Sequence, residues 1–196
     1  MGFLEDNCTV FSYTNEMLNQ SRPFSCGDKD LDDFFLHDAV KYERQLLGKS
    51  YCFRLDNDSS VIVCAFALSN SSIDARNLPN NRKRKLTENI PYEKSLSTYP
   101  ATLIGRLGVD KEFSGKGVGT ELLKFIKNWM LLPSYKTACR YLTVDAYNNE
   151  STLKFYEVNG FKSLFSSDKQ EKEYIGLIQE KELKTRLMYF DLMLLT

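Results

Sequence analysis

The chain has 196 residues, of which 42% are hydrophobic and 13% aromatic. This length and composition suit one domain with a sizeable core, and we expect a single domain over residues 1–196. Lys plus Arg and Asp plus Glu total 26 each, so no overall basic charge draws the chain to nucleic acid or to an anionic membrane.

The cysteine pattern and the apolar runs indicate the redox compartment and the absence of membrane association. Five cysteines lie scattered without a CxxC pair, which argues against a disulfide framework and against a zinc site. We therefore expect no metal and a reducing, cytoplasmic compartment. No apolar run approaches the roughly 18 residues of a membrane span, and MGFLEDN lacks a secretory signal, so we expect no membrane association.

The hydrophobic periodicity predicts alternating strands and helices, with two irregular stretches. Strands are expected over 8–14, 51–55, 61–68, 101–109, 141–146, 161–165 and 186–195, and helices over about 28–48, about 118–132, 151–158 and about 174–182. An extended insertion at 70–98, with room for one or two helical turns, carries the basic run Arg82–Lys85, and a charged insertion at 166–184 precedes the last strand. The expected class is α+β, a mixed α/β fold in one domain.

A glycine-rich turn separates the strand at 101–109 from the next helix. It contains Gly115, Gly117 and Gly119, and such a turn at a helix N-terminus favours binding of a phosphate or pyrophosphate. The Walker pattern GxxxxGK[ST] does not fit, and the third glycine lies one residue early for the Rossmann pattern GxGxxG. The turn therefore indicates a different phosphate-bearing cofactor.

Two motifs resemble the signatures of the GCN5-related N-acetyltransferases. Gly117 and Gly119 take the small positions of the acetyl-CoA signature (Q/R)-x-x-G-x-(G/A), while Ser114 stands where Gln or Arg is usual. Downstream, Asn149 to Phe161 resembles N…A..FYE..GF, with Thr152 in place of Ala. The clear resemblance covers 103–165, about a third of the chain.

The resemblance implies a fold, a cosubstrate and a set of site residues. The fold would be a mixed, mostly antiparallel sheet of about seven strands, flanked by helices and splayed at an acetyl-CoA site. Expected cofactor-binding residues are Leu107, Gly108 and Val109 for the pantetheine arm, the amides of Ser114, Gly115, Lys116, Gly117, Val118, Gly119 and Thr120 for the pyrophosphate, and Asn149 for the pantetheine or adenosine portion.

Tyr156 is the expected catalytic residue, because the family's tyrosine at this position protonates the departing thiolate. The alternatives are a packing role for Tyr156 and a helix-capping role for Asn149. The general base stays open between Asp145, Glu150 and a water relay. Arg106 is expected to form a structural salt bridge or to contact the substrate. The lone histidine, His37, is distant from the motifs.

The implied function is transfer of an acetyl group from acetyl-CoA to a primary amine by direct attack, with a small molecule or a peptide as acceptor. Within the family, the segments Phe24–Asp32 and Gly105–Asp110 resemble toxins that acetylate aminoacyl-tRNA. Because the chain is neutral and Arg82–Lys85 is its one dense basic run, we rank a tRNA acceptor below the small-molecule or peptide amine. A non-catalytic acyl-CoA-binding module is the alternative of another class. Assembly as a dimer is left open.

Overall fold

A computed structural model describes residues 2–88, 90, 96–134 and 137–196. The chain forms two compact units. The first unit comprises residues 1–70 and 104–132, and the second comprises 71–103 and 133–196. Our expectation of a single domain stays a prediction.

The strands of both units form a mixed sheet with the order β1-β2-β3-β4-β5-β7-β6. The pairs β1–β2, β2–β3, β5–β7 and β6–β7 are antiparallel, and β4–β5 is parallel, with Ala101–Leu103 beside Tyr141–Thr143. The strands are β1 Cys8–Ser12, β2 Lys49–Leu55, β3 Ile62–Asp74, β4 Thr98–Val109, β5 Tyr141–Tyr147, β6 Lys162–Ser163 and β7 Thr185–Asp191. The expected seven-stranded, mostly antiparallel sheet is confirmed.

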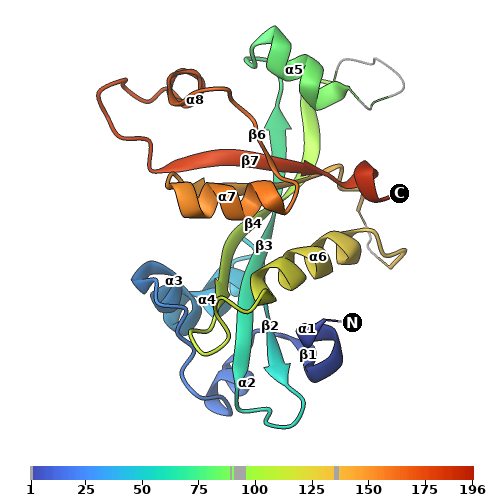
Figure 1. Ribbon diagram of the computed structural model, residues 1–196, viewed down its shortest axis with the longest axis vertical. Coiled ribbons are helices and arrows are strands. Elements are labelled where there is room, and N and C mark those ends of the chain that lie inside the picture. Colours follow the sequence, from blue (N-terminus) through green and yellow to red (C-terminus); the bar gives the residue numbers. More distant parts are fainter. Residues whose placement is uncertain (1, 89, 91–95, 135–136) are drawn as a thin grey trace. The chain divides into compact units, whose positions relative to one another are not determined.

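Helices flank the strands in each unit (Figure 1). They are α1 Phe3–Asn7, α2 Asn15–Asn19, α3 Lys29–Asp33, the π-helix η1 Phe34–Asp38, α4 Ala39–Arg44, α5 Asn80–Thr87, α6 Val118–Met130, α7 Glu150–Val158, α8 Asp168–Ile175 and the 3-10 helix η2 Leu192–Leu195. None of these described helices is long and apolar enough to cross a bilayer.

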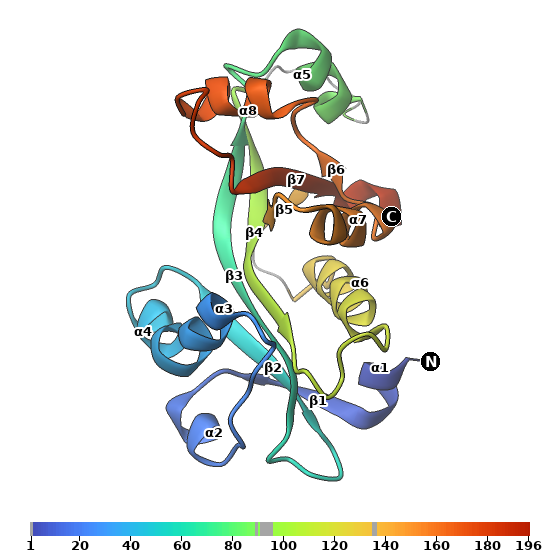
Figure 2. The same cartoon turned by 60° about the vertical axis from the view of Figure 1, so that its left-hand side comes forward.

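In the first unit, α3 and α4 lie on one face of the strands and α6 on the other (Figure 2). Alternation along β2 and β3 explains this arrangement, because successive side chains point to opposite faces. One set of residues packs with α2, η1 and α4 in a buried cluster of Tyr13, Met17, Phe35, Ala39, Cys52, Ile62 and Ala65. The other set supplies Tyr51 and Phe53, whose rings lie 4.7 Å from Trp129 and 4.8 Å from Phe125 of α6. These aromatic contacts fix α6 against the strands.

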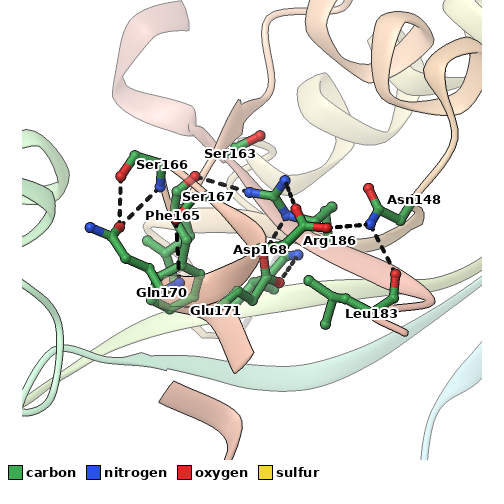
Figure 3. Close-up of polar contacts among 12 residues, drawn as sticks. Asn148, Ser163, Phe165, Ser166, Ser167, Asp168, Gln170, Glu171, Leu183 and Arg186 are labelled. Atoms are coloured by element: carbon green, nitrogen blue, oxygen red, sulfur yellow. Dashed lines mark hydrogen bonds and ion pairs between the residues drawn. The ribbon is translucent and has the colours of Figure 1, made fainter. Parts of the chain in front are cut away.

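In the second unit, an arginine network joins α8 to β7 (Figure 3). Arg186 Nε donates to Glu171 at 2.6 Å, and its Nη1 donates to Asp168 at 2.7 Å. Glu171 also accepts from the backbone N–H of Leu187 at 2.6 Å, and Asn148 donates to Asp168 at 3.0 Å. The network holds the charged 166–184 segment on the strand that follows it.

Several expected boundaries are wrong. β3 continues to Asp74, past the expected strand end at residue 68. Within the expected insertion at 70–98, α5 occupies Asn80–Thr87, which agrees with the one or two helical turns expected there; residues 89 and 91–95 lie outside the described part. The helix expected at 174–182 runs instead from Asp168 to Ile175. Ser167 caps its start by accepting from Gln170 N, and Gly176 ends it with φ +69°.

The last strands are also shorter than expected, and two helices were not predicted. Pairing in the expected strand 161–165 is confined to Lys162 and Ser163. β7 ends at Asp191, whose carboxylate accepts from Met193 N at 3.1 Å and starts η2. The short helices α1 and α2 precede and follow β1.

Candidate functional site

The loop that follows β4 is anchored by Asp110 in the first unit. Its N–H donates to the carbonyl of Val63 at 2.9 Å. Its carboxylate accepts from the N–H of Ser25 at 3.1 Å and from that of Glu112 at 3.0 Å. The neighbouring Lys111 N–H donates to the Ser25 carbonyl at 3.0 Å. These bonds fix the chain at the point where it leaves the strand for the glycine turn.

The glycine turn presents backbone rather than side chains at the start of α6. Gly115 and Gly117 have φ of +72° and +84°, a region that favours glycine. A Cβ at either position would meet no heavy atom within 4 Å. Gly117 is the N-cap of this 13-residue helix and provides no side-chain cap. The N–H groups of Thr120 and Glu121 donate to the Gly117 carbonyl at 3.0 and 3.1 Å, so the amides that precede them and the positive end of the helix dipole are the groups suited to an anion.

Lys116 is the charged side chain within the turn. Its ammonium donates to the Glu112 carbonyl at 2.7 Å and lies 5.8 Å from the ring centre of Phe113. Val118 is 2% exposed, so its side chain belongs to the core. Ser114 to Thr120 thus form one continuous turn and first helical residues, as the sequence predicts. Their cofactor contacts stay a prediction.

Gly108 permits a close approach of the N-terminal segment to β4. A Cβ there would lie 3.1 Å from Cys26 Cβ and 3.2 Å from Phe24 Cζ, contacts closer than ordinary packing allows. Leu107 and Val109 alternate with Gly108 and point to the other face of the strand. Gly108 is therefore explained by packing, whereas binding of a pantetheine arm by this strand remains a prediction.

The segment around Cys26 packs against β4 at Gly108, although the sequence predicts no site role for it. Asp32 accepts from Ser25 Oγ and from the Cys26 N–H, each at 2.7 Å. Burial alone would raise the pKa of Asp32, but these hydrogen bonds lower it below its usual value. Asp28 caps α3 by accepting from Asp30 N and Leu31 N. The sequence pattern that indicates this arrangement is the pair Asp28 and Asp32, four residues apart, directly after Ser25-Cys26-Gly27.

In the second unit, Asn149 and Tyr156 lie at the start and near the end of α7. Asn149 is the N-cap, and its Oδ1 accepts from Thr152 N at 2.9 Å. The expected alternative, a capping role, is therefore present, and contact with a cofactor stays a prediction. Gly160, with φ +81°, ends the helix, and the N–H of Phe161 donates to the Tyr156 carbonyl at 3.0 Å.

Tyr156 packs among aromatic rings. Its ring centre lies 5.1 Å from that of Phe155 and 5.4 Å from that of Phe161. Burial raises the pKa of Tyr156 to about 12, because the phenolate would be poorly solvated there. The phenol is consequently protonated at neutral pH, which is the state that a general acid requires.

The remaining candidates take the following places. The Arg106 guanidinium lies 5.1 Å from the ring centre of Phe34, and its Nη2 is 3.9 Å from Asp30. The expected salt bridge of Arg106 is therefore present, though long and partly exposed. Asp145 and Glu150 are exposed. His37 contacts Asp33 at 2.9 Å on an exposed face of its helix. Among the described residues, no group of three or more His, Cys, Asp or Glu is arranged to hold a metal.

Solved structures share the fold of this chain over nearly its whole length. AtaT complexed with acetyl-methionyl-tRNAfMet is 21% identical, with 96% of each chain covered and a TM-score of 0.68. A tyrosine-to-phenylalanine mutant of KacT is 19% identical, with 97% of this chain and 100% of that chain covered and a TM-score of 0.69. The chain therefore has the α/β fold of these proteins.

Sequence comparison relates part of the chain to a known family. Residues 87–163 match the family described as acetyltransferase (GNAT) domain. A tRNA-acetylating toxin of Mycobacterium tuberculosis is 31% identical over 101 residues, which are 52% of this chain and 54% of that protein. The match thus spans about half the length of this curated relative. Residues 87–163, which contain both signatures, are therefore similar to the acetyltransferase (GNAT) domain.

Proposed function

We propose that this protein transfers an acetyl group from acetyl-CoA to the amino group of an aminoacyl-tRNA. The observation that carries the proposal is the uncapped, glycine-headed N-terminus of α6, which lies within the segment that matches the acetyltransferase family. The acceptor is inferred from the relatives: one is a tRNA-acetylating toxin, and one neighbour was solved with acetyl-methionyl-tRNAfMet. This inference raises the tRNA acceptor above the small or peptide amine that we ranked first.

The glycine turn fits the pyrophosphate of acetyl-CoA. The open space beside Gly115 and Gly117 and the absence of a side-chain cap at Gly117 leave room for phosphate oxygens next to backbone N–H groups. A structural neighbour, AtaTR bound with AcCoA, is 20% identical with a TM-score of 0.65. We infer that Ser114 to Thr120 bind the pyrophosphate and that Leu107 to Val109 accompany the pantetheine arm.

Bound acetyl-CoA supplies a thioester carbonyl that the substrate amine attacks directly. Tyr156 holds its proton on the phenol oxygen and gives it to the sulfur as the carbon–sulfur bond breaks. A proton leaves the attacking nitrogen as the amide bond forms, so the products are an N-acetylated amine and free CoA. General acid catalysis of this kind contributes about two to four orders of magnitude in rate.

Free-thiol release from acetyl-CoA tests the proposed function. Aminoacyl-tRNA, the same tRNA without its amino acid, and a panel of small and peptide amines serve as acceptors. We expect rapid release with aminoacyl-tRNA and none with uncharged tRNA. Faster turnover of a small or peptide amine would restore the acceptor that we first ranked highest. Acetyl-CoA binding without turnover on any amine would instead indicate a non-catalytic module.

A further inference from the structure

The helix α5 in the second unit carries a dense positive charge that the proposed chemistry does not use. Its sequence, NNRKRKLT, contains four consecutive cations, Arg82 to Lys85, and no acidic residue. Successive residues of an α-helix are about 100° apart, so the four side chains point in different directions around the helix. One of them is therefore directed inward, and the others have different surroundings.

Arg82 is the inward-pointing cation and anchors the helix. Its Nε donates to the Leu164 carbonyl at 2.6 Å, and its Nη2 donates to the Ser163 carbonyl. One turn further along the same face, Leu86 is 1% exposed, and its carbonyl accepts from Tyr141 Oη at 2.6 Å. Because carbonyls satisfy hydrogen bonds without cancelling a full charge, Arg82 fixes α5 in place and keeps its positive charge.

A cavity of about 520 Å³ lies beside this helix. It is lined by Arg82, Lys85, Glu88, Glu157, Lys162, Ser163, Phe165, Ser166, Arg186 and Tyr189. The two aromatic residues are buried, at 1% and 6% exposure, so the open lining is mainly polar. Such a lining favours a charged ligand over an apolar peptide side chain.

The cations of this cavity differ in how far their charge is balanced. Arg186 forms ion pairs with Asp168 and Glu171 at 2.7 and 2.6 Å. Across the part of the chain that the structure describes, no ion pair joins Arg82, Lys85 or Lys162 to a carboxylate. Glu88 and Glu157 line the same cavity and reduce its net charge. We therefore expect one phosphate group to bind weakly at this cavity. Its binding would strengthen contacts that the same ligand makes elsewhere on the protein.

We propose that α5 and this cavity form a docking surface for the phosphate backbone of RNA, with Lys85 and Lys162 contacting the phosphates. The inference rests on the proposed function, in which the substrate is a tRNA, and it assigns part of the RNA contact to the second unit. Flexible lysines neutralise phosphates without reading base sequence. The surface would thus position tRNA molecules of different sequence equally well.

The salt dependence of binding to uncharged tRNA tests this surface. We expect the double variant Lys85→Gln/Lys162→Gln to bind more weakly and to show a slope of log affinity against log salt smaller by about 2, since each phosphate contact contributes about 0.9. The matched control is Lys169→Gln/Lys181→Gln, which removes the same charge from exposed positions in and after α8. Acetyl-CoA affinity and thermal unfolding serve to show that both variants are folded.

Each outcome of this experiment has a distinct meaning. Equal slopes for the double variant and its control, or no binding of tRNA by the unaltered protein, would overturn the docking surface. Binding of polyglutamate by a protein that does not bind tRNA would also overturn the docking surface, in favour of an acidic protein partner. If tRNA binding depends on Lys85 and Lys162 but no aminoacyl-tRNA is acetylated, the docking surface is supported and the proposed function is wrong.

Discussion

The ring of Tyr156 packs against that of Phe161, with centroids 5.4 Å apart and planes inclined by 70°. The glycine between α7 and Phe161 makes this contact possible, since Gly160 turns the chain back with φ +81°. The last part of the FYE..GF signature therefore has a structural role: it fixes the ring of the proposed general acid.

Replacing Tyr156 with Phe should lower the rate of acetyl transfer by about two to four orders of magnitude, because the thiolate would lose its proton donor. The aromatic packing is kept, so acetyl-CoA affinity and stability should change little. Thiol release measures the rate, and calorimetry measures the affinity. Tyr174→Phe is the control, since its hydroxyl donates to the Asp74 carbonyl at 2.9 Å and has no assigned catalytic role. Equal activity of Tyr156→Phe and the unaltered protein would show that Tyr156 is a packing residue.

The pH profile of kcat/KM should rise as the acceptor amine loses its proton, and it should show no decline from ionisation of Tyr156. The acceptor amine attacks only when neutral, and an α-amino group has an ordinary pKa of about 8. Because burial raises the pKa of Tyr156 to about 12, its acid form persists throughout the range in which the amine loses its proton. We expect kcat/KM to rise and then level off up to about pH 9. A decline below pH 9 that Tyr156→Phe abolishes would contradict this assignment.

Gly117→Ala should weaken acetyl-CoA binding, because an Ala with φ near +84° carries a backbone strain of about 1–2 kcal/mol. If the turn relaxes, its amides no longer face the pyrophosphate. Gly176→Ala is a matched control, with φ +69° and equally open surroundings at the end of α8. Equilibrium binding should show a loss for Gly117→Ala alone. The same affinity for both variants would mean that the turn does not bind the cofactor.

Glu171→Ala should strongly destabilise the protein, by about 3–5 kcal/mol, as expected when one partner of a buried ion pair is removed. The side chains of Arg186 and Glu171 are 11% and 4% exposed, and the guanidinium would keep Asp168 and the Phe165 carbonyl as partners. Glu173→Ala, on the exposed side of α8, should change stability by less than about 0.5 kcal/mol. Denaturant unfolding measures both. A small effect of Glu171→Ala would show that the network is not required for stability.

The fold was predictable where hydrophobic periodicity is strong. The seven strands and α7 follow from apolar patterns, and the glycine turn before α6 follows from its spacing. The prediction failed where capping decides the structure. Ser167 and Gly176 set the limits of α8, and the carboxylate of Asp191 turns an apolar run into η2.

The expected strand at 161–165 is shorter than its apolar run for a different reason. Phe161, Leu164 and Phe165 are buried at 1–2% exposure, so the run reflects burial in the core as well as the pairing of Lys162 and Ser163 with β7. The candidate site is predicted from the spacing of the glycines and from the tyrosine of the second signature, and its contacts with acetyl-CoA stay a prediction. The contact of Gly108 with Phe24 and Cys26 joins segments distant in sequence, and no local pattern indicates it.

The most direct test of the central claim is identification of the acetylated product. The purified protein is incubated with labelled acetyl-CoA and aminoacyl-tRNA, the tRNA is recovered, and its ester bond is cleaved by mild alkali. We expect the label in an N-acetyl-amino acid released from the tRNA, with little label when Tyr156→Phe replaces the unaltered protein. Label that stays on the RNA after cleavage, or no label on the tRNA while another amine is acetylated, would contradict the proposed function.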